Sequence, residues 1–361
     1  MAPPTRVLSA ARGTWRQAAD ADGADWARGC VSTEESTNMM KKIWGGGWRF
    51  LALLSTVLLG GCSSRDFWLF DAKGVISQTQ VHYMVIDVVV MLVIIIPTAL
   101  LIMWAMWRYR KSAGATYAPH WSHSNAIEAI VWGVPILTVA VLSYYSVEAI
   151  YQVNPYKPTV LARAEAAPAP RPLEIDVIAT DWRWVFIYPA QHIMSVGRLV
   201  IPVDTPVKFR LTSTSVTNDF YIPQLVGMID VMPGMRVKQA LMASHVGTYE
   251  GFSADYSGAG FSWMNFQTDA VPSAQFQQWT KQAQQAPQHM DYAQFDLFAK
   301  PDISVSGKPE YFSDVEPGIF DHVVGEVMNG KVWPTPMGMT ENMVKYLQKQ
   351  RASQAQMQGE L

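Results

Sequence analysis

Residues 88–107 have the sequence VVVMLVIIIPTALLIMWAMW and residues 129–147 have the sequence AIVWGVPILTVAVLSYYSV; neither run contains a charged side chain. Each run is close to the ~20 residues that a helix needs to cross a hydrocarbon core about 30 Å thick. No comparable run follows residue 150 in this chain of 361 residues. The sequence therefore predicts a two-span membrane anchor, and it excludes both a wholly soluble protein and a many-helix transporter.

The charges that flank these runs predict the direction of the spans. The first predicted span, residues 83–107, is followed at once by the basic residues Arg108, Arg110 and Lys111. Basic residues beside a span mark the cytoplasmic side, so the loop 108–125 is expected inside the cell. The second span, residues 126–147, then returns the chain to the outside.

Two carboxyl groups, Asp87 and Glu128, lie near the ends of the predicted spans. Ionisable groups at membrane depth are costly and are therefore candidates for function. Both side chains are within about one helical turn of an interface, where a carboxylate can reach water. A simple solvated carboxylate is thus the alternative for each.

A shorter apolar stretch precedes the anchor, in the sequence KKIWGGGWRFLALLSTVLLGGC of residues 41–62. Its basic start, apolar middle and small residues before the cysteine are typical of a secretory signal. The segment LGGC, residues 59–62, resembles the lipobox of bacterial lipoproteins. This resemblance implies that residues 39–61 are a signal peptide and that Cys62 is lipidated. The alternative is an ordinary cysteine in an anchor helix.

Met39 or Met40 is the expected start of translation, because residues 1–38 show no apolar periodicity. Residues 1–38 are then an extension that the mature protein lacks, and residues 62–82 form a periplasmic linker. Cys30 and Cys62 are the only cysteines and the net charge is −2. These values exclude a disulfide scaffold and a multi-cysteine zinc site, and they give no electrostatic footprint for nucleic acid.

The rest of the chain is predicted to be a β-domain with a helical extension. A Pro- and Ala-rich linker, residues 154–172, leads into short alternating segments bounded by Pro, Gly, Asn or Asp, which predict an antiparallel sandwich or barrel over residues 173–271. These segments are LEIDVI (173–178), WRWVFIY (182–188), VKFRLTS (207–213), RVKQALM (236–242) and TYEGFSA (248–254). Residues 272–345 are predicted to form a helical extension and residues 346–361 a disordered tail.

Four segments resemble subunit II of the haem-copper terminal oxidases, and the resemblance covers about residues 75–330. The segments are HSNAIEAIVWGVPI (123–136), ATDWRWVFIYP (179–189), LTSTSVTNDFYIP (211–223) and YEGFSADYSGAGFSWM (249–264). The resemblance implies a membrane-anchored α+β protein, in which a two-helix transmembrane hairpin precedes a periplasmic cupredoxin-type β-sandwich and a C-terminal helical extension. Such a domain docks on the outside of subunit I.

The copper-ligand positions of that family carry other residues here. The cytochrome c-oxidising members use two histidines, two cysteines and a methionine, which are soft or borderline ligands suited to copper. The matching positions in this chain are Asn218, Ser253, Ser257 and Phe261, with only Met264 retained. Neutral hydroxyls cannot bridge two coppers as thiolates do, so no metal is expected on this chain. Met264 is expected to be a core thioether.

Because it lacks these ligands, the chain resembles the quinol-oxidising branch of the family, the cytochrome bo-type ubiquinol oxidases. The segment YFSDVEPGIFDHVVGEVM (311–328) also resembles the C-terminal extension of the subunit in that branch. A quinol dissolves in the bilayer and reaches subunit I directly, so no copper relay is needed. The resemblance implies that the complex couples ubiquinol oxidation and oxygen reduction to proton pumping. Haem and copper would lie in subunit I, and this chain would carry no catalytic residue and bind no cofactor.

The resemblance also implies partners and roles. The expected partners are subunit I, further small membrane subunits and ubiquinol bound by the complex, without nucleic acid or cytochrome c, in the bacterial inner membrane. Glu128 falls at a family glutamate near the inner mouth of a proton-uptake route, and Asp255 falls where the family has an ion-binding glutamate but is one methylene shorter. Trp182 and Trp184 are expected in sheet and interface packing, and His192 and His245 in structural positions.

Two alternative functions remain at this point. One is a menaquinol oxidase subunit, because the quinone site would lie on another chain. The other is a free-standing membrane-anchored binding module that reuses a cupredoxin fold.

Overall fold

The computed structural model describes residues 68–114, 123–156, 162, 171–303, 309–331, 333 and 339–359, the last with side chains to residue 352. The predicted extension 1–38, the predicted signal peptide 39–61 and Cys62 lie outside the described residues. Most of the predicted linker 154–172 lies outside them as well.

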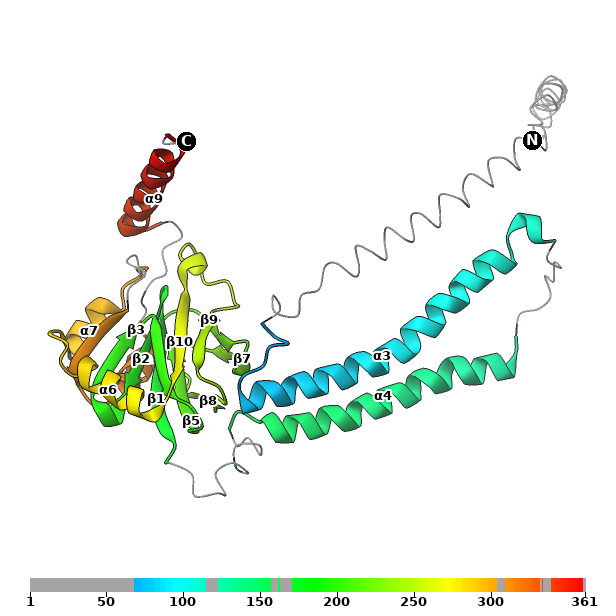
Figure 1. Cartoon of the computed structure of the whole chain (residues 1–361), viewed down its shortest axis with the longest axis horizontal. Helices are drawn as coiled ribbons and strands as arrows, with labels where there is room; N and C mark the ends of the chain where they lie inside the picture. Colours follow the sequence, from blue (N-terminus) through cyan, green and yellow to red (C-terminus); the bar gives the residue numbers. More distant parts are fainter. Residues whose placement is uncertain are drawn as a thin grey trace, which may run out of the picture. The chain divides into compact units, whose positions relative to one another are not determined.

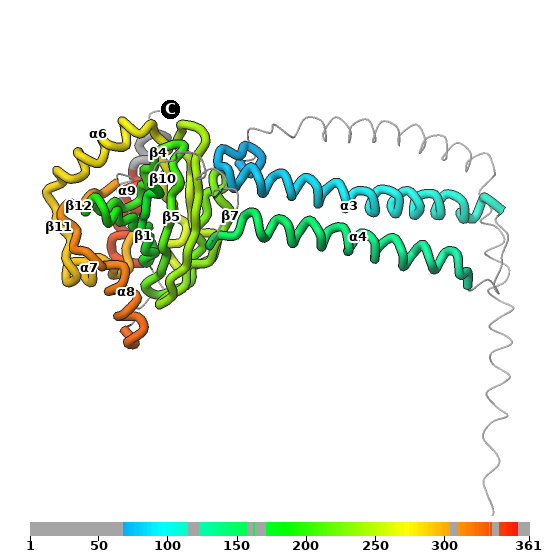
Figure 2. The backbone as a smooth tube through the Cα atoms, turned by 90° about the horizontal axis from the view of Figure 1, so that it is seen from below, coloured from blue at the N-terminus to red at the C-terminus, as the bar shows by residue number. Residues whose placement is uncertain are grey.

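Two long helices follow the predicted spans and run side by side (Figures 1 and 2). They are α3 (Val75–Arg108) and α4 (Asn125–Val153), and both are long and apolar enough to cross a membrane. Each helix includes one proline, Pro97 or Pro135. Both helices extend beyond the predicted spans 83–107 and 126–147. The apolar length determines which part of a helix can cross the membrane, and the helix itself can continue past that part.

The first turn of α3 belongs to the β-domain, so the predicted linker 62–82 is too long. Ser77 Oγ donates to the carbonyl of Gln224 at 2.7 Å, and Ile76 is 1% exposed within the hydrophobic core. Gly74 forms a β-bridge with Ala243. Residues 73–77 are therefore fixed on the domain, and the helix leaves it without an intervening linker.

Two sheets pack face to face in the β-domain (Figure 1). The first has the order β11 (His289–Met290), β12 (Glu310–Val315), β3 (Ile193–Val196), β2 (Arg183–Tyr188), β1 (Leu173–Thr180), β5 (Val207–Ser213) and β8 (Val237–Leu241). The second has the order β4 (Arg198–Pro202), β10 (Asn265–Val271), β9 (Gly247–Phe252), β6 (Asn218–Ile222) and β7 (Val226–Val231). All five predicted strand segments are strands. The prediction of purely antiparallel pairing is wrong, since β1 pairs with β5 and β4 with β10 in parallel.

Aromatic side chains fill the space between the sheets. Phe220 and Phe266 stack with ring centroids 5.5 Å apart, and Trp184 meets each of them at 5.6 Å. Such pairs contribute about 0.5–1.5 kcal/mol beyond the area that they bury. These rings fix the separation of β2 from β6 and β10, and with it the position of the loops at the sandwich edge.

The predicted helical extension 272–345 also supplies strands. Its helices are α6 (Ser273–Ala283), α7 (Tyr292–Phe298) and α8 (Ile319–Met328), but β11 and β12 lie between them and lengthen the first sheet through pairing with β3. The elements of the extension lie beside that sheet (Figure 2), and their apolar side chains form a second core with its outer face. The strand β12 forms because the alternating sequence EYFSDV meets an unpaired edge at β3.

The last helix, α9 (Glu341–Gly359), extends through most of the segment that was predicted to be disordered, residues 346–361. Met343 is fully buried and Tyr346 contacts Trp263 with ring centroids 6.3 Å apart. These contacts anchor the first turns of the helix. The residues that follow are mostly Gln, Lys, Arg, Ala and Met, which have high helix propensity, so the helix continues to Gly359.

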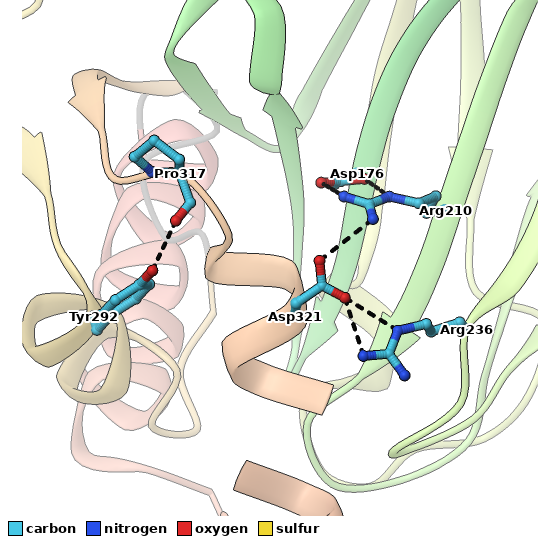
Figure 3. A network of polar contacts seen from close by, with 6 residues as sticks. All are labelled: Asp176, Arg210, Arg236, Tyr292, Pro317 and Asp321. Carbon is cyan, nitrogen blue, oxygen red and sulfur yellow. Dashed lines mark hydrogen bonds and ion pairs between the residues drawn. The ribbon is translucent and has the colours of Figure 1, made fainter. Parts of the chain in front are cut away.

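Ion pairs join α8 to the first sheet (Figure 3). Arg210 on β5 donates to both oxygens of Asp176 at 2.6 Å. Asp321 on α8 accepts from Arg210 at 3.4 Å and lies 3.0 Å from Arg236. Tyr292 on α7 donates its hydroxyl to the carbonyl of Pro317 at 2.7 Å, just before α8. The extension is thus attached to the sandwich by charged contacts as well as by its core.

Candidate functional site

The segment between β9 and β10 brings most of the family's copper-ligand positions together. Ser253 Oγ donates to Asn218 Oδ1 at 3.3 Å, and Ser257 Oγ donates to Met264 Sδ at 3.7 Å. All four side chains are at most 4% exposed. These four side chains therefore form a buried cluster at this edge of the β-sandwich, and Met264 is a buried core thioether as predicted.

The polar groups of this cluster satisfy one another. Besides donating to Asn218, Ser253 Oγ accepts from the backbone N–H of Asp219 at 3.2 Å. Asn218 Nδ2 donates to the carbonyl of Val216 at 3.1 Å. Buried hydroxyl and amide groups need such partners, because an unpaired polar group in the interior costs free energy. The donor set is neutral and mostly oxygen, and it does not fit a dinuclear copper centre.

Phe261 does not join the cluster. It begins the short 3₁₀ helix η4 (Phe261–Trp263), and its ring lies half-buried against Tyr256, with centroids 5.6 Å apart. Tyr256 is itself 74% exposed. The 3₁₀ turn therefore places Phe261 in a half-buried position outside the core of the domain.

Trp182 packs against this loop from the interior of the domain. Its indole N–H donates to the carbonyl of Ser257 at 2.8 Å, and its ring lies so close to Gly260 that a Cβ there would be 2.2 Å away. Trp182 and Trp184 are both fully buried in the sandwich. The predicted sheet packing is confirmed, and the predicted interface packing is wrong because neither ring reaches the surface of the chain.

Two carboxyl groups beside the cluster, those of Asp219 and Asp230, were missed by sequence reasoning. Asp219 on β6 is directly opposite Asp230 on β7. Burial, a hydrogen bond with Asp230 and the charges of Asp230 and Asp255 raise the pKa of Asp219 to about 6. The register of β6 and β7 creates this pair, and eleven residues of separation in the sequence give no sign of it.

The substitution Asp219→Asn is expected to stabilise the domain at neutral pH. The pKa of Asp219 is higher in the fold than the ordinary value of about 3.9, so the folded state favours the protonated form. Wild-type stability is therefore lost as the pH rises from about 4 through about 6. The amide that replaces the carboxyl group stays neutral, so the variant should gain on the order of 1–2 kcal/mol at pH 7.5 and nothing at pH 4.

Urea titrations at the two pH values measure this difference. Asp255→Asn is the matched control, because Asp255 is exposed and its charge acts only at a distance. An Asp219→Asn variant that is less stable than wild type at pH 7.5 would contradict the raised pKa of Asp219.

The other candidates lie apart from the cluster. Glu128 is in the first turn of α4, with one oxygen 3.5 Å from His123 Nδ1. Asp87 is half-buried on α3 and Asp255 is exposed on the loop. His192 is in a left-handed conformation after the turn Pro189–Gln191, and His245 contributes its carbonyl to Tyr249. None of these side chains meets the buried cluster through a contact among the described residues.

Comparisons with known proteins agree with this geometry. Residues 189–271 match the family described as "Cytochrome C oxidase subunit II, periplasmic domain", and residues 284–331 match the "COX Aromatic Rich Motif". The second match covers α7, α8, β11 and β12, so the extension that packs on the outer face of the sandwich is itself a recognised part of this architecture.

Full-length relatives extend the match to the membrane helices. The chain is 39% identical to "Ubiquinol oxidase subunit 2" of Acetobacter aceti, over 86% of this chain and 95% of that protein. It is 38% identical to "Cytochrome bo(3) ubiquinol oxidase subunit 2" of Pseudomonas putida, over 79% and 88%. It is 34% identical to "Quinol oxidase subunit 2" of Bacillus subtilis, over 70% and 77%. With its two apolar helices, its cupredoxin-type sandwich and its aromatic-rich extension, this chain belongs to the quinol oxidase subunit 2 family.

Proposed function

We propose that this chain is the second subunit of a proton-pumping ubiquinol oxidase and that it contributes no redox centre of its own. The observation that carries the proposal is the hydrogen bonding among Asn218, Ser253, Ser257 and Met264, which uses polar groups at positions where the copper-bearing branch has metal ligands. Relatives named ubiquinol oxidase subunit 2 support the quinol as substrate.

The chemistry of the carrier explains why such a subunit needs no metal. A soluble electron carrier delivers electrons from outside the membrane and needs a relay in the exported domain. Ubiquinol reaches the catalytic subunit within the bilayer. Haem and copper are then held by subunit I, and this chain packs its two helices and its periplasmic domain on that subunit.

Activity of the purified complex tests the proposal. We expect rapid oxygen uptake with ubiquinol, none with reduced cytochrome c, and copper in the amount that subunit I alone requires. Faster uptake with menaquinol than with ubiquinol would favour the menaquinol alternative. Purification of this chain without any haem-bearing partner would favour the free-standing binding module.

Glu128 is proposed to lie at the entrance of a proton-uptake route at the cytoplasmic end of α4. We expect Glu128→Gln to slow ubiquinol-driven oxygen reduction by about threefold or more, because an amide can neither take up nor release a proton. Assembly and haem content should not change. Glu148→Gln is the matched control, since Glu148 lies near the opposite end of the same helix and accepts only from Gln152 among the described contacts. Unaltered activity in Glu128→Gln would leave Glu128 as a solvated carboxylate.

Cys62 is proposed to be the lipidated first residue of the mature chain, in the bacterial inner membrane. Intact-mass measurement should find a chain that begins at residue 62 with added acyl mass. Cys62→Ser should abolish that mass but not assembly, because two spanning helices anchor a chain far more firmly than lipid does. The presence of residues 1–38 in the purified protein would contradict both the start site and the lipidation.

A further inference from the structure

The helices of the C-terminal extension carry a group of side chains unrelated to the buried cluster. Asp296 on α7 lies against His322 and Glu326 on α8, and their potential ligand atoms all lie within 4.8 Å of one another. It is the one such group of His, Cys, Asp or Glu found among the described residues. All three side chains are partly buried.

The local structure positions these groups for a common ligand. His322 and Glu326 are four residues apart on α8, so their side chains share one helix face. Tyr292 on α7 stacks on the ring of His322, with centroids 4.7 Å apart and planes at 24°. Asp296 is four residues after Tyr292 on the same face of α7. The ring of His322 is thus fixed in plane, and Asp296 Oδ1 lies 3.5 Å from its Nε2.

The two atoms that face each other, Asp296 Oδ1 and His322 Nε2, are in contact but form no hydrogen bond. Asp296 Oδ1 and His322 Nε2 are buried and have no hydrogen-bond partner in the part of the chain that the structure describes. Two ligands of a tetrahedral ion with bonds of about 2.0–2.2 Å lie about 3.3–3.6 Å apart. The separation of these two atoms, 3.5 Å, is therefore that of two atoms on one metal ion.

A cation already sits beside the group. Lys331 Nζ pairs with Asp296 Oδ2 and lies 2.8 Å from Glu326 Oε2. The ammonium also lies 4.6 Å from the centre of the Trp333 ring. The side chain of Lys331 is 30% exposed, so it can move into water without crossing the core. The site therefore attracts positive charge, and its present occupant is displaceable.

We propose that Asp296, His322 and Glu326 form a binding site for a divalent ion of the Zn²⁺ class, which takes the place of the Lys331 ammonium and joins α7 to α8. One imidazole nitrogen and two carboxylates are a borderline donor set that suits Zn²⁺ or Co²⁺ better than Mg²⁺, which prefers oxygen ligands alone. The two carboxylates balance the charge of the ion, and water completes the coordination.

Metal binding to the purified, chelator-treated complex tests the site, with Zn²⁺ and Co²⁺ as probes. We expect the wild-type complex to bind one more Zn²⁺ than the His322→Gln variant, and Co²⁺ to give visible absorption bands that this variant lacks. His289→Gln is the matched control, because His289 is another histidine of the extension and meets only Asp314, at 4.0 Å, in the described contacts. It should bind metal as the wild type does.

The substitution Lys331→Met is expected to strengthen Zn²⁺ binding. Zn²⁺ should bind about tenfold more tightly to this variant, since the ion no longer has to break two partly exposed ion pairs. Glu326→Gln provides a second loss-of-site variant if His322→Gln does not assemble, because Glu326 is a third exposed. Equal Zn²⁺ stoichiometry in the wild type and both loss-of-site variants, or unchanged affinity in Lys331→Met, would overturn the proposal.

Discussion

A variant with Asn218→His, Ser253→Cys, Ser257→Cys and Phe261→His is expected to acquire a dinuclear copper centre that the unmodified chain lacks. The intervals from residue 253 to 257, 261 and 264 are four, four and three, which repeat the spacing of the copper-bearing family. The new thiolates and imidazoles, with Met264, would supply the soft and borderline donors that copper requires.

The structure shows that the loop ends are held together and identifies two difficult positions, Phe261 and Asn218. The backbone N–H of Ser253 donates to the carbonyl of Met264 at 3.3 Å, so both ends of the loop are tied together. Phe261 is half-buried against Tyr256 and lies apart from the buried cluster, so its replacement removes little core packing but the new imidazole has to turn into the loop to reach the copper. Asn218 is fully buried, so the larger imidazole is the substitution most expected to strain the fold.

Copper stoichiometry and intense thiolate-to-copper visible absorption are the measurements. The full chain should be used, because β12 and the first turn of α3 complete the sandwich and a fragment ending near residue 300 would lose β12. The double variant Ser253→Cys, Ser257→Cys is the control, with thiolates but no imidazoles. A folded quadruple variant without copper would show that the loop is aligned wrongly, and tight copper binding by the unmodified chain would remove the main support for a subunit without a redox centre.

The substitution Trp182→Ala should lower the free energy of unfolding of the periplasmic domain by about 3–5 kcal/mol. The indole is fully buried, contacts Gly260 and donates to the carbonyl of Ser257. Removing it leaves a cavity beneath the loop and an unpaired carbonyl. Trp182→Phe keeps most of the volume and should cost only about 1–3 kcal/mol for the lost hydrogen bond.

Urea unfolding followed by near-ultraviolet circular dichroism measures these losses. Tyr256→Ala is the matched control, because Tyr256 is an aromatic residue of the same loop that is 74% exposed. It should change the free energy of unfolding by less than about 0.5 kcal/mol. If Trp182→Ala were no more destabilising than Tyr256→Ala, the indole would not support the loop.

Local patterns along the chain predicted the helices and strands that need only an apolar environment on one or both faces. The charge-free runs predicted α3 and α4, and alternation predicted the five strand segments that the structure contains. Sequence also predicted that Met264 is buried. These predictions succeed because apolar length and alternating burial are local properties, which the residues of one segment determine by themselves.

Pairing between distant segments was not predicted. Alternation alone does not distinguish a parallel neighbour from an antiparallel one, so the pairing of β1 with β5 required the fold. The strand β12 lies among helices in the sequence, and only the free edge of β3 makes it part of the sheet. The last helix continues where composition predicted disorder, since buried contacts of Met343 and Tyr346 fix its first turns.

The same division applies to the sites. The sequence alone determined that the copper-ligand positions hold no cysteine or histidine, because the identity of a donor atom is a property of the residue. Tertiary structure decided that Asn218 meets Ser253, that Asp219 faces Asp230, and that Asp296 reaches His322. Each of these contacts depends on strand register or helix packing between segments that are far apart in the sequence. The packed core holds such segments together and thereby sets distances of a few ångströms between their side chains.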